Sequence, residues 1–87
     1  MQFLHNDLGQ LRGGEVVEVT LDKAANVKLM DSSDFSSYRG GRRHGSYGGY
    51  ITESPYRVSV PTSGHWHLAI DLGGYAGSVR AGVRVLG

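Results

Sequence analysis

The sequence contains no cysteine, which excludes disulfide bonds and thiolate metal sites as sources of stability in this chain of 87 residues. No apolar run approaches the roughly 20 residues of a membrane span, and the first residues lack the basic and then apolar form of a signal peptide. These absences predict a cytoplasmic protein without a membrane partner. Its stability must come from a thin core or from a second subunit.

An excess of charge of either sign is also absent, since nine basic and eight acidic residues give a net charge of +1 with neutral histidines. A balance this close to zero argues against nucleic acid as a partner. Basic residues nevertheless gather in mid-chain, where Arg42, Arg43 and His44 follow one another. Because guanidinium groups bind carboxylates and phosphates, this segment is a candidate site for an anionic small molecule or an acidic protein surface.

Short runs with alternating apolar and polar residues make up most of the chain. The clearest are residues 16–21, 27–29, 56–60, 65–72 and 79–85, and residues 3–8 are a weaker candidate that ends at Gly9. Such alternation is typical of half-buried strands, and many short strands between glycine-rich turns are typical of β-sandwiches. The sequence therefore predicts one all-β domain over residues 1–87, an antiparallel β-sandwich of about six to eight short strands.

A single core is predicted from the shared period of these runs. Residues on the apolar side of each strand have no other face on which to collect. The side chains expected to be largely buried are Trp66, Leu68, Ile70, Val79, Val83, Val17, Val19 and Val58.

Two pairs of strands are predicted to form hairpins. One joins residues 16–21 to 27–29, and the other joins 65–72 to 79–85 across the glycine-rich turn at 73–77. The register proposed for the second hairpin sets Asp71 opposite Arg80 and His67 opposite Arg84 on its outer face. That face is the second candidate site for an anion, and its residues are His65, His67, Arg80 and Arg84.

One short helical turn is expected near residues 32–38. Asp31 or Ser32 can cap it, Phe35 and Tyr38 lie three apart on one side, and Gly40 can end it. The segment that follows, residues 39–50, is too rich in glycine to be a central strand, so we expect a loop or a loose hairpin there.

His65 and His67 are the residues most suited to bind a metal, because side chains two apart on a strand project to the same side. The run from His65 to Asp71 resembles the first half of a cupin metal motif, although no second motif with ligands follows. Asp71 is the third candidate, but it lies roughly 13 Å beyond His67 along the same strand. The sequence therefore predicts no metal and no cofactor. A metal-dependent enzyme of cupin-like chemistry that uses His65 and His67 remains the alternative.

Motifs of the common enzyme classes are missing. The chain has no cysteine nucleophile, no Gly-x-Ser-x-Gly elbow and no phosphate-binding loop after a strand. We therefore expect a binding module and not an enzyme. A structural subunit that forms a homo-oligomer through its outer face is the third interpretation.

Three segments resemble a known family: Leu29 to Ser33, Ser63 to His67, and Asp71 to Gly77. They look like a small bacterial family that is catalogued only as a domain of unknown function, and the likeness spans nearly the whole chain. Members of that family are compact all-β sandwiches, found alone or joined to a Toll/interleukin-1-receptor (TIR) domain. The resemblance implies a binding or sensing module and supplies no catalytic residues.

Overall fold

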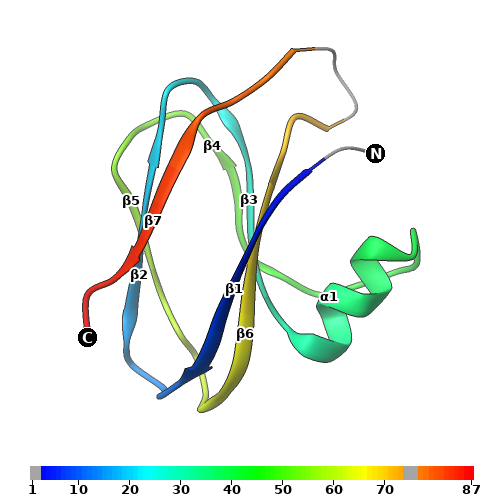
Figure 1. Ribbon diagram of the computed structural model, residues 1–87, viewed down its shortest axis with the longest axis vertical. Coiled ribbons are helices and arrows are strands. Elements are labelled where there is room, and N and C mark those ends of the chain that lie inside the picture. The colour runs from blue at the N-terminus through cyan, green and yellow to red at the C-terminus, as the bar shows by residue number, and fades with distance from the viewer. Residues whose placement is uncertain (1–2, 74–76) are drawn as a thin grey trace.

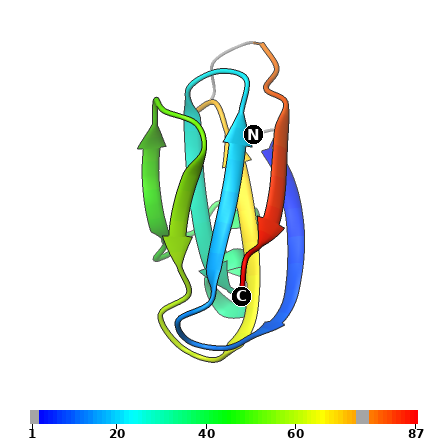
Figure 2. The ribbon, with the colours of Figure 1, turned by 90° about the vertical axis from the view of Figure 1, so that its left-hand side faces the viewer.

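The computed structural model describes residues 3–73 and 77–87, in which seven strands and one helix form. In chain order these are β1 (Phe3–Leu11), β2 (Val16–Leu21), β3 (Ala25–Asp31), α1 (Ser32–Arg39), β4 (Tyr47–Ile51), β5 (Tyr56–Ser59), β6 (Gly64–Asp71) and β7 (Ala81–Val85). They form a four-stranded sheet, β1-β6-β3-β4, and a three-stranded sheet, β5-β2-β7 (Figures 1 and 2). Every pairing is antiparallel. The predicted antiparallel β-sandwich is confirmed.

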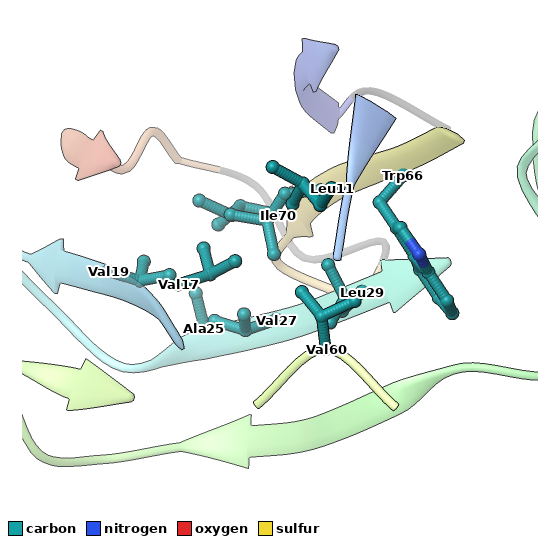
Figure 3. Close-up of a cluster of buried hydrophobic side chains, with 10 residues drawn as sticks. Leu11, Val17, Val19, Ala25, Val27, Leu29, Val60, Trp66 and Ile70 are labelled. Atoms are coloured by element: carbon teal, nitrogen blue, oxygen red, sulfur yellow. The ribbon is translucent and has the colours of Figure 1, made fainter. Parts of the chain in front are cut away.

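The main core lies between the two sheets (Figure 3). Alternation turns Val17 and Val19 of β2 toward Leu29 of β3 and Ile70 of β6, and all four side chains are inaccessible to solvent. Each such side chain stabilises the fold by about 1.5 to 3 kcal/mol relative to its exposed form. The predicted core residues that are buried are Val17, Val19, Trp66, Leu68 and Ile70.

Three other predicted core residues, Val58, Val79 and Val83, are only partly buried and pack against the core from its border. Val58 belongs to β5 and Val83 to β7, which are the two edge strands of the three-stranded sheet. An edge strand has a neighbour on one side only, so its inward side chains keep some contact with water.

Both predicted hairpins are wrong. β2 and β3 follow one another in the chain but belong to opposite sheets, and so do β6 and β7. β6 instead pairs with β1 and β3, and β7 pairs with β2. The proposed contacts of Asp71 with Arg80 and of His67 with Arg84 therefore do not form. Residues 74–76 of the predicted turn lie outside the described part of the chain.

Glycine has a local role in each of two strands. β1 continues beyond Gly9, where the predicted run ended, because the register shifts between Asp7 and Gly9 and Gly9 takes a positive φ of 72°. In β4, Gly48 lies so close to β3 that a Cβ atom would overlap the carbonyl oxygen of Val27. The loop or loose hairpin predicted for residues 39–50 is therefore wrong in its last third, which belongs to the strand β4 at the edge of the four-stranded sheet, paired with β3. An edge position suits the glycine content of this segment.

Helix α1 covers the outer face of the four-stranded sheet (Figure 1). The Asp31 carboxylate caps it by accepting a hydrogen bond from the backbone N–H of Asp34 at 2.8 Å, and Gly40 follows its last residue. Phe35 and Tyr38 face the sheet, so the predicted helical segment is confirmed. They form a second apolar cluster with Met30, Ala69 and Phe3. Within the described residues, no helix is long and apolar enough to cross a membrane.

Candidate functional site

Two of the predicted site residues, His65 and His67, lie on the outer face of the four-stranded sheet, beside α1. Three rows of side chains cross β1, β6 and β3 on this face. From one end to the other, the rows are Asp7, His67 and Met30; then His5, Ala69 and Lys28; then Phe3, Asp71 and Asn26. The small side chain of Ala69 at the centre leaves room for α1. Polar groups remain on both sides of the helix.

On the β1 side, three histidines and one carboxylate lie together, and we call His5, Asp7, His65 and His67 the histidine cluster. Nε2 of His65 is 2.6 Å from Oδ1 of Asp7, and Nε2 of His5 is 3.0 Å from Nδ1 of His67. One donor atom from each of Asp7, His65 and His67 can be chosen so that all three lie within 4.8 Å of one another. Imidazole nitrogens and carboxylate oxygens at this spacing are able to bind one metal ion.

His67 is the buried member of the histidine cluster, with 8% of its surface exposed. Phe35 of α1 stacks on its ring at a centroid distance of 4.6 Å, and Oγ of Ser32 is 2.9 Å from its Nε2. Burial lowers the pKa of His67 below its ordinary value of 6.5, so the imidazole is neutral at pH 7. A neutral imidazole is the form that acts as a ligand.

Asp7 is ionised and exposed at the rim of the cluster. The backbone N–H of Gly9 donates to its Oδ1 at 2.9 Å, and that bond together with the one to His65 lowers the pKa of Asp7. Among the described residues, its only ion-pair partner is His65. A negative charge therefore sits beside two imidazoles.

Asp71 has a structural role and does not join the histidine cluster. Its Oδ2 accepts from the Tyr38 hydroxyl at 2.6 Å, and its Oδ1 accepts from Asn26 and from the Gly73 N–H. Burial opposes ionisation of Asp71, but the three hydrogen bonds outweigh it and lower the pKa of Asp71. Burial and the same carboxylate raise the pKa of Tyr38. Asp71 thus ties α1 to the sheet.

On the other side of the helix lies the connection between α1 and β4, residues 40–46, which holds the predicted basic residues Arg42, Arg43 and His44 and which we call the basic loop. Lys28 of β3 donates to Nε2 of His44 at 3.3 Å, and the His44 ring packs edge-on against Tyr38 at 5.0 Å. Arg42 and Arg43 are exposed. Neither forms an ion pair with an acidic residue in the part of the chain that the structure describes.

Arg80 and Arg84 lie far from the histidines, on the three-stranded sheet. Arg84 Nε donates to Glu18 at 2.7 Å, and Arg57 donates to the other oxygen of the same carboxylate at 2.9 Å. Arg80 lines a shallow open depression at the end of β2. The predicted face that joins His65 and His67 to Arg80 and Arg84 therefore does not form, because the histidines lie on β6 of one sheet, whereas Arg84 lies on β7 of the other sheet and Arg80 directly precedes β7.

Glu18 is expected to make stability depend on pH. Only 4% of its surface is exposed, and the hydrogen bonds from Arg84 and Arg57 lower its pKa below the ordinary 4.5. A lowered pKa stabilises the fold above pH 4.5, and this contribution disappears as the pH falls through the folded-state value. We expect the urea midpoint of Glu18→Gln to lie below that of the wild type at pH 7. At pH 3 the two midpoints should be nearly equal. Glu53→Gln, at an exposed acid, is the control. A gap that stays constant between pH 7 and pH 3 would contradict this.

Two members of the histidine cluster, His5 and Asp7, were missed in the sequence. They are two residues apart, as His65 and His67 are, so the first run carries the same signal of side chains on one face. The two pairs of residues form one cluster only because β1 is the neighbour of β6, and the sequence alone does not show that pairing. The predicted absence of a metal rested on Asp71 as the only third ligand, and Asp7 removes that premise.

The fold and this face define a class: a small antiparallel β-sandwich whose larger sheet carries a helix and polar side chains on its outer side. The chain belongs to the family described as "Domain of unknown function (DUF1883)", which it matches over residues 1–87. No curated protein and no solved structure matches it significantly.

Proposed function

We propose that this domain is a non-catalytic binding module that recognises an anionic group through its basic loop. The observation that carries the proposal is the pair of exposed arginines, Arg42 and Arg43, which form no ion pair within the described residues. Each guanidinium group is able to donate two parallel hydrogen bonds to a carboxylate or phosphate group. The chemistry recognised is therefore a carboxylate or phosphate on a partner protein or a small molecule.

The backbone of the basic loop is held in place, which supports its use as a binding element. The N–H of Arg42 donates to the carbonyl of Ser37 at 2.8 Å, and the N–H of Gly45 donates to the Asp34 carboxylate at 3.1 Å. Between them, His44 donates through Nδ1 to the carbonyl of Arg42 at 3.1 Å. A loop anchored at both ends loses less conformational entropy when it binds.

The resemblance to bacterial domains joined to TIR domains supports the same interpretation. In such an arrangement, this sandwich is the unit that binds or senses, in a cytoplasmic bacterial protein. A homo-oligomer is the alternative use of an exposed face, and light scattering of the purified chain at several concentrations distinguishes it from a monomeric module.

The proposal is tested by anisotropy with a fluorescein-labelled octaglutamate peptide, in competition with tripolyphosphate. We expect Arg42→Ala/Arg43→Ala to weaken binding at least about tenfold, since charged hydrogen bonds contribute roughly 1.5 to 3 kcal/mol each. The matched control, Arg12→Ala/Arg80→Ala, removes the same charge from exposed arginines elsewhere. It should change the affinity less than about twofold.

The two probes separate the two sources of the anion. Competition by tripolyphosphate at low concentration indicates a phosphate ligand, and its failure to compete indicates an acidic protein surface. Equal losses in the two double variants would show attraction to net charge alone and overturn the proposal. Absence of binding to both probes would also overturn it.

A further inference from the structure

The histidine cluster forms where two strands place donors on the same face. His65 and His67 alternate with the inward Trp66 on β6, so both imidazoles point outward. Asp7 lies directly opposite His67 on β1, and its carboxylate reaches diagonally to His65. Three donors from two hydrogen-bonded strands are therefore fixed side by side without any contribution from a loop.

We propose that Asp7, His65 and His67 bind one divalent transition-metal ion on the outer face of β1 and β6. Zinc ligands 2.0 to 2.2 Å from the ion lie roughly 3.3 to 3.6 Å apart in a tetrahedron. The three donors already lie within 4.8 Å of one another. Asp7 and His65 have side chains that are 54% and 47% exposed, so small rotations can adjust the spacing, including a widening of the 2.6 Å between Oδ1 of Asp7 and Nε2 of His65.

The donor set selects the class of metal. Two imidazoles and one carboxylate suit zinc and its neighbours in the first transition series, whereas magnesium and calcium prefer oxygen ligands alone. Three protein ligands leave at least one coordination position for water or another exogenous group. The site would thus hold zinc with an open position at the protein surface.

The surroundings of His67 fix its orientation, as the partners of a metal ligand do in known sites. The Ser32 hydroxyl is able to accept a hydrogen bond from the N–H at Nε2 of His67, which leaves Nδ1 as the ligand atom. Phe35 stacks nearly parallel to the imidazole, at 10°. His5 now contacts Nδ1 at 3.0 Å and must move away or become a fourth ligand when the metal binds.

The test is isothermal titration of zinc chloride into the full chain, free of any tag and stripped with a chelator. We expect one zinc ion per chain. Loss of a ligand should exceed the 10- to 100-fold effect of outer partners, so His65→Ala and Asp7→Asn should each weaken binding more than about a hundredfold. Both residues are exposed, so these variants should fold. Ser32→Ala should weaken binding about tenfold.

His44→Ala is the matched control, because His44 is the histidine outside the cluster and should leave the zinc affinity unchanged. Zinc should also raise the melting temperature of the wild type and of His44→Ala, but not of His65→Ala. The proposal is overturned if the wild type binds no stoichiometric zinc, or if His65→Ala and Asp7→Asn both keep its affinity. Since the ligand variants His65→Ala and Asp7→Asn lie outside the basic loop, either result leaves the proposed function of that loop to its own test.

Discussion

Replacing Trp66 with alanine is expected to lower the free energy of unfolding by about 3 to 5 kcal/mol. The indole is 4% exposed at one end of the main core (Figure 3), and its Nε1–H donates to the carbonyl of Thr62 at 2.9 Å. Alanine would leave a cavity and an unpaired carbonyl group. Small domains have only about 5 to 15 kcal/mol of total stability, so much of the population should unfold under mild denaturing conditions.

Urea titration measures this change, and far-UV circular dichroism must follow it because Trp66 is the single tryptophan. Tyr50→Ala is the control, since Tyr50 is a large aromatic residue that is 68% exposed on β4. Its substitution should change stability by less than about 0.5 kcal/mol. An unchanged midpoint for Trp66→Ala would show that this core assignment is wrong.

Alternation predicted the faces of the strands but not their neighbours. Val17 and Val27 point inward whether their strands pair in one sheet or face each other across the core, so the pattern is the same in both cases. The connection at residues 22–24 is short enough for a hairpin, yet it carries the chain from one sheet to the other. The partners of a strand depend on how the whole chain packs. The local alternation of apolar and polar residues carries no information about that packing.

The candidate site was predictable only to the extent that it lies within one segment. The basic loop follows from Arg42 to His44 as consecutive residues, and the projection of His65 and His67 to one side follows from their spacing. Their partners are far away in the chain: Asp7 lies 58 positions before His65, and His5 lies 62 positions before His67. A site made by two distant strands emerges only when their pairing is known.

The second large effect is expected for Phe35→Ala, which removes the aromatic contact between α1 and the histidine cluster. Phe35 is 6% exposed and stacks on His5 at a centroid distance of 4.1 Å and on His67 at 4.6 Å. Loss of a buried phenylalanine lowers the free energy of unfolding by about 3 to 5 kcal/mol. We expect a loss in this range by urea titration. Phe35→Leu, which keeps most of the apolar surface, should lose less than about 1.5 kcal/mol.

Two probes decide whether α1 unfolds with the sandwich or separately. Met30 and Ala69 belong to the cluster beneath α1, while their chain neighbours Leu29 and Leu68 belong to the main core, so β3 and β6 support both. This shared support predicts one cooperative transition, with Trp66 fluorescence and circular dichroism giving the same midpoint in the wild type and in Phe35→Ala. Different midpoints would show that α1 detaches while the sandwich stays folded. Phe35→Ala would then expose His67 without unfolding the core, and the helix would be a removable cover over the histidine cluster.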